Sequence, residues 1–262
     1  MEKIRKYFTF FKITFINDLA YVSNYIGQFF TFALFMFVYS FVWRAIYSGK
    51  TVIEGYSFEM VMWYFMFTET VMMSKYPFYS DMAEEIKSGD IAYSLNKPYS
   101  YILFNFSKYI STSVIRMFLN TVFGSFIILI ITGSFPVKLS GFLFGFISAF
   151  FGLVLNFFFF FLLGLTAFWF EDNSSFAFIY GKFLFTVGGL FMPVEFFPAF
   201  VRNITDYMPF KYIIYVPARS YIEGFGTFIG FFPVQLLNIL IYGILVYILY
   251  SFAVKRLNVN GG

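Results

Sequence analysis

The sequence predicts an all-α integral membrane protein with six transmembrane helices, an interfacial amphipathic helix at the N-terminus and short re-entrant-like outer helices between spans five and six. Composition indicates the membrane class, because hydrophobic residues make up 60% of the 262 residues and charged residues only 12%. Soluble domains contain roughly 45–50% apolar and about 25% charged residues. A soluble core of this size could not bury 46 Phe and 21 Tyr side chains. The whole chain, residues 1–262, is expected to form one transmembrane domain.

Composition also excludes several classes of function. The chain has no Cys, which removes disulfides, thiolate metal sites and Cys nucleophiles. It has no His, the most common general base and metal ligand. We therefore expect no catalytic residues, no metal site and no bound cofactor. The net charge of +4 is modest and fits the basic cytoplasmic side of a membrane protein, so the expected partner is the lipid bilayer and not nucleic acid.

Residues 1–18 are expected to lie on the inner leaflet as an interfacial helix. Wound as a helix, Ile4, Phe8, Phe11 and Phe15 form one apolar stripe, and basic residues flank it. This arrangement is typical of helices that bury one face in the headgroup region. A solvated basic tail is the alternative.

The transmembrane helices are predicted from apolar runs of about 20 residues, the length that crosses a bilayer. The second run is weaker in hydropathy because it contains Glu59 and Glu69. With six spans both termini share one side, and the larger number of Lys and Arg in the resulting inner segments favours cytoplasmic termini in a cell membrane. The six runs lie near Tyr21–Val42, Tyr56–Lys75, Tyr109–Ile131, Gly141–Phe170, Phe176–Val194 and Phe231–Ala253.

The inner connection between spans two and three, residues 77–108, is the only long polar stretch. Residues 81–87 are rich in charge and predict a short helix that Gly89 ends. Ile91 and Leu95 are one helical turn apart and give a small apolar face. A structured loop of this size favours a docking surface over a solvated connector.

The outer connection between spans five and six, residues 195–230, is too polar for a span but rich in aromatic residues. Prolines divide it into short pieces, and aromatic side chains suit the membrane boundary. We expect two short helices, around Pro198–Tyr207 and Tyr212–Ile222, that dip into the outer leaflet.

Small residues at Gly141, Gly145, Ser148 and Gly152 recur on one face of the fourth span. Such a stripe allows another helix to approach closely. It predicts packing within the chain or between protomers, without indicating any chemistry.

Glu69 is the charged residue that the sequence places deepest in a span. Intramembrane carboxylates are costly and usually face the interior of a bundle. Two interpretations remain open: Glu69 lines a translocation pathway, or it pairs structurally with Arg116 or Lys182.

A short motif at 48–51 has the Gly-Lys-Thr ending of a phosphate-binding loop. The pattern requires a further glycine where this chain has Arg44. We therefore expect no ATP site in this chain.

Two stretches at their expected topological positions make the chain resemble the membrane subunit of type-2 ABC exporters, a family that includes drug, antibiotic and polysaccharide exporters. The first is Glu84–Ile91 followed by Leu95–Pro98, which is similar to the ATPase-contacting loop of the family. The second is Gly188–Pro198, followed by Arg202, Ile204, Pro209, Phe210 and Tyr212.

The resemblance implies a permease without catalytic residues, formed by two copies or by a related pair. Separate ATPase subunits would bind ATP and Mg²⁺ and dock on the first inner loop. The implied coupling residues are Asp81, Glu84, Glu85, Ile86, Lys87, Gly89, Asp90, Ile91, Leu95 and Pro98. The implied outer gate comprises Gly188, Gly189, Pro193, Glu195, Phe197, Pro198 and Pro209.

Two other functions stay open at this stage. A proton-coupled secondary transporter would use Glu69, although the two halves show no obvious internal repeat of the kind many such transporters have. A membrane-embedded lipid-modifying enzyme would need the carboxylates of the inner loop, which lacks paired acidic motifs. The sequence does not identify the transported substrate.

Overall fold

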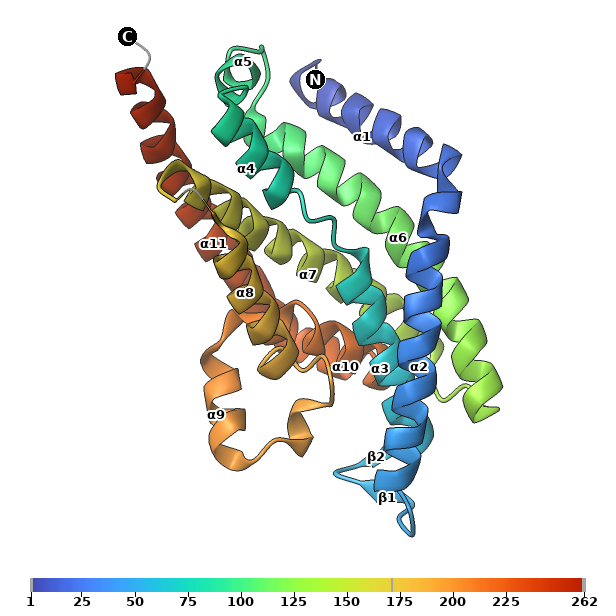
Figure 1. Cartoon of the computed structure of the whole chain (residues 1–262). Coiled ribbons are helices and arrows are strands. Elements are labelled where there is room, and N and C mark those ends of the chain that lie inside the picture. The colour runs from blue at the N-terminus through green and yellow to red at the C-terminus, as the bar shows by residue number, and fades with distance from the viewer. Residues whose placement is uncertain (1, 171, 261–262) are drawn as a thin grey trace.

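The computed structural model describes residues 2–170 and 172–260, with side chains except at 2–4, 22, 24 and 256–260. Helices dominate the described residues (Figure 1). The helical elements are α1 (Glu2–Ala20), η1 (Val22–Tyr25), α2 (Ile26–Ile46), α3 (Phe58–Ser74), α4 (Tyr79–Ser88), α5 (Ile91–Leu95), α6 (Tyr101–Thr132), α7 (Leu139–Leu165), η2 (Thr166–Phe168), α8 (Ser174–Thr186), η3 (Val194–Phe196), α9 (Ala199–Tyr207), η4 (Pro209–Tyr212), α10 (Tyr215–Glu223) and α11 (Phe225–Asn260).

A hairpin of two short strands, each of two residues, joins α2 to α3, where the sequence predicted only a loop and the start of a span. Strands β1 (Val52–Ile53) and β2 (Tyr56–Ser57) pair antiparallel around Glu54 and Gly55. Both turn residues have positive φ, 48° and 86°, as a tight hairpin turn requires. Ser57 then caps α3, because its side chain accepts a hydrogen bond from the backbone N–H of Met60 at 3.3 Å.

Among the described residues, four helical segments are long and apolar enough to cross a membrane: Ile26–Ile46, Tyr101–Thr132, Leu139–Phe168 and Phe225–Lys255. The other two predicted spans form α3 and α8, of 17 and 13 residues. At 1.5 Å per residue they measure about 26 and about 20 Å, against a hydrocarbon core of about 30 Å. The chain is an all-α multi-pass membrane protein, and the count of six spans stays a prediction.

Helix boundaries differ from the predicted ones where capping residues act. Helix α6 begins at Tyr101 rather than Tyr109, because Ser100 accepts a hydrogen bond from the backbone N–H of Leu103 at 3.4 Å. The inner connection is correspondingly shorter than the predicted 77–108. Helix α11 begins at Phe225 rather than Phe231. The turn at Gly188 and Gly189 stops α8 well before Val194.

Helix α3 occupies the middle of the molecule, between α2 and α6 and against α10 (Figure 1). Every residue from Val61 to Val71 is buried. This burial explains why α3 contains polar residues that made it a weak span by hydropathy, since its side chains meet protein and not lipid. By contrast, α2, α6 and α11 present exposed apolar side chains such as Phe30, Ile130 and Leu240, which a bilayer would cover.

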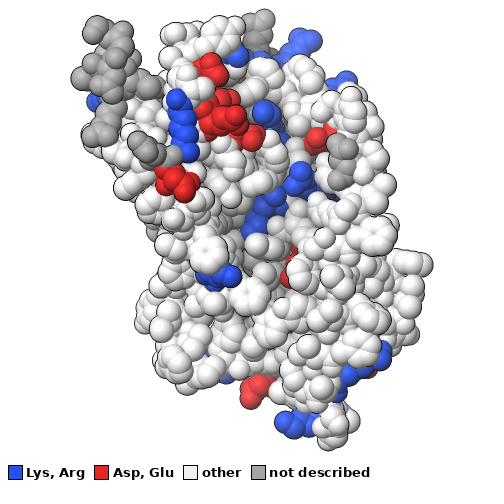
Figure 2. All heavy atoms as spheres, viewed as in Figure 1, with Lys and Arg blue, Asp and Glu red and all other residues white. Residues whose placement is uncertain are grey.

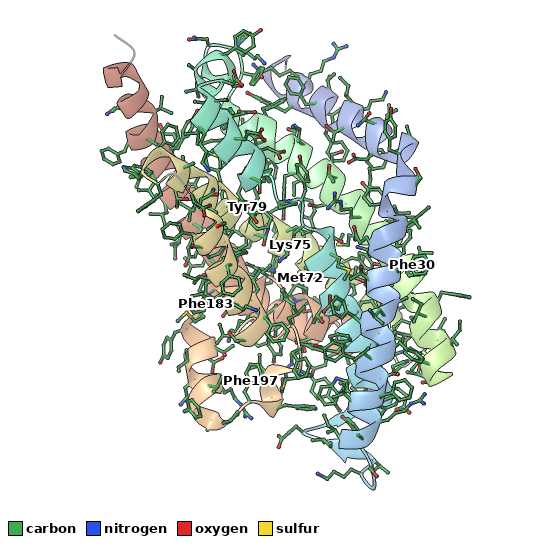
Figure 3. All side chains as sticks on the ribbon, in the orientation of Figure 1. Phe30, Met72, Lys75, Tyr79, Phe183 and Phe197 are labelled. Carbon is green, nitrogen blue, oxygen red and sulfur yellow. The ribbon has the colours of Figure 1, made fainter. Side chains whose placement is uncertain are left out.

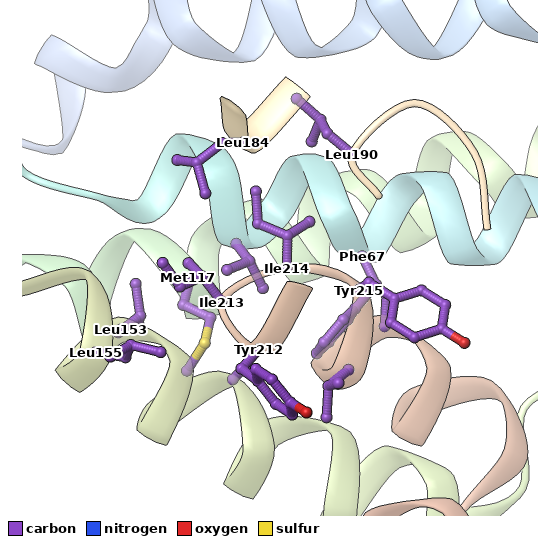
Figure 4. Close-up of a cluster of buried hydrophobic side chains, with 14 of the residues drawn as sticks. Phe67, Met117, Leu153, Leu155, Leu184, Leu190, Tyr212, Ile213, Ile214 and Tyr215 are labelled. Carbon is purple, nitrogen blue, oxygen red and sulfur yellow. The ribbon is translucent and has the colours of Figure 1, made fainter. Parts of the chain in front are cut away.

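The small-residue stripe of α7 receives the segment that contains η4 and α10. A Cβ atom on Gly145 would lie 2.6 Å from Cβ of Tyr221, and one on Gly152 would lie 2.7 Å from the carbonyl oxygen of Ile213. The predicted close approach is therefore made within the chain. Figure 4 shows the resulting core, in which Ile213 and Ile214 lie among side chains such as Phe67, Leu153 and Leu184.

The N-terminal helix forms as predicted and packs along α6. The ring of Phe10 lies 5.0 Å from that of Phe104, and Ser111 donates a hydrogen bond to the carbonyl of Phe11 at 2.9 Å. Phe8 is exposed, while Phe11 and Phe15 are half-buried. The side chain of Ile4 lies outside the described part. The start of α1 and the end of α11 lie at the same end of the molecule as α4 and α5 (Figure 1).

Candidate functional site

The predicted site residues fall into three groups connected by α3: the inner loop that follows it, the polar residues near its C-terminal end, and the outer turn that packs on it.

The first group is built on α4, a two-to-three-turn helix that contains the predicted 81–87 segment. Gly89 ends α4 with a φ of +83°, the left-handed conformation that glycine adopts without steric cost. Met82 is buried against α7, where a Cβ on Gly164 would come 2.5 Å from its sulfur. This close packing fixes the distance between α4 and the bundle.

Two hydrogen bonds orient α4 further. The hydroxyl of Tyr76 donates to Asp81 in the first turn, and the hydroxyl of Tyr101 on α6 donates to Glu85 at 2.8 Å. Glu84 and Lys87 are exposed. Figure 2 shows acidic side chains gathered on the surface where Figure 1 places α4. The helix is thus held on one side and charged on the other.

The remaining residues of the inner loop divide between anchors and surface. Ile91 is fully buried, and Ile86 and Leu95 pack against the core as half-buried side chains. Asp90 is exposed and accepts a hydrogen bond from Ser88 at 2.9 Å. Pro98 is exposed, and its carbonyl accepts a hydrogen bond from Lys6 of α1 at 2.7 Å. The apolar face predicted from Ile91 and Leu95 therefore points mainly into the protein.

The second group surrounds Glu69, which is 7% exposed on α3. No ion pair among the described residues joins Glu69 to Arg116 or Lys182. Arg116 instead lies over the rings of Tyr25 and Tyr76, and Lys182 over Phe178 of its own helix. The structural pairing proposed from the sequence is not found.

Lys75 is a second buried charged residue of this group, and the sequence analysis did not connect it with Glu69. It is 8% exposed, and its ammonium donates to the sulfur of Met72 at 2.7 Å and lies 6.0 Å from the Tyr180 ring centre. Figure 3 places Met72 and Lys75 between α8 and α2, and Figure 2 shows basic side chains in a recess there. The spacing of Glu69, Met72 and Lys75 along α3, every third residue, was the available signal.

The third group begins with the turn after α8. Gly189 has a φ of +75°, and its carbonyl accepts a hydrogen bond from the Tyr64 hydroxyl at 2.5 Å. The hydroxyl of Thr68 donates to the next carbonyl, that of Leu190, at 3.0 Å. The carbonyl of Gly188 accepts from the backbone N–H of Tyr215 at 3.2 Å. The turn is therefore fastened to both α3 and α10.

An ion-pair network joins the segment after this turn to α10. Arg219 pairs with Glu195 and with Glu223, each at 2.9 Å. The hydroxyl of Tyr215 donates to Glu195 at 2.7 Å and accepts from Arg219 at 2.7 Å. The sequence analysis identified Glu195 but missed Tyr215, Arg219 and Glu223, since their connection depends on the fold of residues 195–223.

The prolines of the outer connection start its short elements, which agree with the two predicted outer helices. Pro193 precedes η3, Pro198 precedes α9, and Pro209 is the first residue of η4, where the missing N–H costs no hydrogen bond. Phe197 is half-buried (Figure 3). It lines a pocket of about 480 Å³ with Glu195 and Arg202.

The arrangement offers surfaces and a recess. Among the described residues, no group of three or more Asp or Glu is placed to hold a metal ion. What the geometry supplies is a charged helix at one end, two buried residues of opposite charge in the middle and a braced turn at the other end.

A family model described as "ABC-2 family transporter protein" matches residues 33–261. No curated protein matches the sequence.

Proposed function

Because this chain belongs to the ABC-2 transporter family, we propose that it is the membrane-spanning permease subunit of an ATP-driven exporter. Two copies, or this chain and a related permease, would form the translocation pathway. ATP and Mg²⁺ would bind to separate ATPase subunits, which dock from the cytoplasm on the inner loop. Both termini would then be cytoplasmic, as the distribution of Lys and Arg favours.

The coupling role is supported mainly by the contacts that attach α4 to α7 and α6. Its exposed side offers Glu84 and Lys87 to a partner, while Met82 packs on α7 and Glu85 is bonded to α6. A displacement of α4 would therefore move both long helices together. ATP can drive such a displacement only by binding one arrangement better than the other.

The recess at Glu69 and Lys75 supports a pathway between subunits. Lys75 and Met72 lie near the centre of the chain's long dimension, on a face between α2 and α8 (Figure 3), and Glu69 is buried further along α3. A second permease against this face would enclose the recess. The braced turn at Gly188 and Gly189, with Pro193, Glu195, Phe197, Pro198 and Pro209, would then close its outer end.

The test is co-purification from native membranes through a tag on this chain, scored for a stoichiometric nucleotide-binding subunit. Glu84→Lys reverses an exposed charge on α4 and should abolish co-purification, with membrane insertion unchanged. Glu54→Lys, an exposed charge reversal in the distant hairpin, is the matched control. Glu85→Lys is a less selective variant, because it also breaks the bond to Tyr101.

An ATPase that stays bound to Glu84→Lys would contradict docking on α4. Transport that needs a proton gradient and no nucleotide would favour the proton-coupled alternative with Glu69. Conversion of lipid by the purified chain alone would favour the enzyme.

A further inference from the structure

A polar pocket of about 220 Å³ lies where α1 meets α2 and both approach α6. It shares no lining residue with the pocket beside Phe197. The pocket is lined by Asn17, Asp18, Tyr21, Tyr25, Gln28 and Arg116.

The pocket contains two opposite charges that are not paired with each other. The Oδ2 atom of Asp18 and the Nε atom of Arg116 are buried, and neither has a hydrogen-bond partner among the described side chains and backbone. No ion pair joins the two side chains, both of which are described. Buried polar groups in proteins are nearly always satisfied, so an acceptor and a donor left open in one pocket indicate a ligand.

A ligand that carries both a negative and a positive group would complement the two charges of the pocket. A phosphate would accept hydrogen bonds from the Arg116 guanidinium, which suits phosphate geometry. An ammonium would donate to Asp18 and lie near the rings of Tyr21 and Tyr25, since aromatic faces attract cations. A primary ammonium can donate hydrogen bonds to a carboxylate, whereas a trimethylated one has no N–H to donate.

The surroundings identify the source of this group as a lipid. Ile16 and Leu19, which flank the pocket residues Asn17 and Asp18 in sequence on α1, are 56% and 47% exposed, as expected for a helix in the headgroup region. These apolar side chains would contact acyl chains below a bound headgroup. We propose that the pocket binds the phosphoethanolamine headgroup of a bilayer phospholipid.

The pocket is connected to α4 through Arg116. The guanidinium carbon lies 5.7 Å from the Tyr76 ring centre, and Tyr76 donates its hydroxyl hydrogen to Asp81 of α4. Burial and the bond to Asp81 raise the pKa of Tyr76 above its usual range, so the hydroxyl keeps its donor proton. A bound headgroup that holds Arg116 in place would steady the N-terminal turn of α4.

The experiment measures lipid retained by the purified full-length chain. The chain is equilibrated with equal amounts of phosphatidylethanolamine, phosphatidylglycerol and phosphatidylcholine, and the lipids that remain after delipidating washes are quantified by mass spectrometry. Wild type should retain phosphatidylethanolamine above the other two. Arg116→Gln should lower this retention about tenfold, the effect of losing one strong charge-assisted contact.

Asp18→Asn gives the sharper test, because it leaves Arg116 to hold a phosphate. It should remove the preference for phosphatidylethanolamine over phosphatidylglycerol. Lys12→Gln is the control, since it deletes an exposed charge on α1 that does not line the pocket, and it should behave as wild type. Thermal unfolding of each variant shows whether it is folded. If Arg116→Gln does not fold, the lipid preference of Asp18→Asn alone tests the proposal.

Three results would overturn the proposal. Equal retention of the three lipids by wild type would exclude headgroup selection. A preference unchanged by Asp18→Asn would exclude this pocket as its cause. Displacement of the retained lipid by dilute glycerophosphoethanolamine would indicate a soluble ligand in place of a bilayer lipid. None of these measurements depends on the ATPase partner, so they stand apart from the test of permease function.

Discussion

Replacing Gly189 by alanine tests whether the outer turn is held in place by its contacts with α3 and α10. The residue has a φ of +75°, and a Cβ atom would lie 2.8 Å from Cβ of Tyr215 and 3.1 Å from the hydroxyl oxygen of Tyr64. The same hydroxyl donates to the Gly189 carbonyl at 2.5 Å. The substitution therefore strains the backbone, crowds α10 and displaces a hydrogen bond together.

The expected cost is the sum of these effects. A non-glycine residue in the left-handed region costs roughly 1–2 kcal/mol, and overpacking a filled site costs roughly 1–3 kcal/mol. Loss of the Tyr64 hydrogen bond adds about 1 kcal/mol. We expect Gly189→Ala to lower the free energy of unfolding by about 4 kcal/mol, a decrease in Tm of roughly 8–16 °C for a chain of this size.

Two other glycines separate the contributions in the same thermal unfolding assay in detergent. Gly133→Ala places a Cβ at a φ of +69° with no atom within 4 Å, so it reports the backbone cost alone. Gly181→Ala lies in α8 with open space around it and should be neutral or slightly stabilising. A Tm for Gly189→Ala no lower than that for Gly133→Ala would refute the packing argument.

Two further substitutions test the charged groups. Arg219→Gln leaves Glu195 and Glu223 without their shared partner. It should lower the free energy of unfolding by about 2 kcal/mol, because the three side chains are only partly exposed. A Tm within about 1 °C of wild type would contradict this. Lys75→Met removes the buried cation at the C-terminal end of the same helix and leaves Glu69 buried, so it should reduce both stability and transport. If the two charges interact, the double variant Glu69→Gln/Lys75→Met should lose about 1 kcal/mol less unfolding free energy than the sum of the two single variants. Strictly additive single effects in this double-mutant cycle would show that the two charges act independently.

Much of the fold could be predicted because apolar runs and caps are local signals. The long helices α2, α6, α7 and α11 were expected within several residues, and Gly89 ends α4 as predicted. The two outer helices were expected close to where α9 and α10 lie. The six-span count was not established, since hydropathy registers apolar character but does not show that α8 ends at a glycine turn.

The candidate site residues could be predicted only where they lie close together in the sequence. The inner loop forms a continuous segment, so its residues could be named together. Lys75 was missed because the sequence analysis considered only cations on other helices as partners of Glu69. The Lys75 side chain instead turns back toward α3, where its ammonium donates to the sulfur of Met72. The pocket at Arg116 combines residues nearly 100 positions apart and has no signature in the sequence.

Composition and apolar runs by themselves determined that this protein is a helical membrane protein without His or Cys chemistry. A soluble fold of this length could not bury so many aromatic side chains, and leaving them exposed to water would cost too much free energy. The order of its motifs determined the family resemblance. Only the tertiary structure decided that α3 is buried, that the α7 stripe receives α10 and that Asp18 and Arg116 face one pocket without pairing. These outcomes depend on which surfaces meet after helices form, and a local pattern such as the small-residue stripe shows that a face packs without showing which distant segment packs on it.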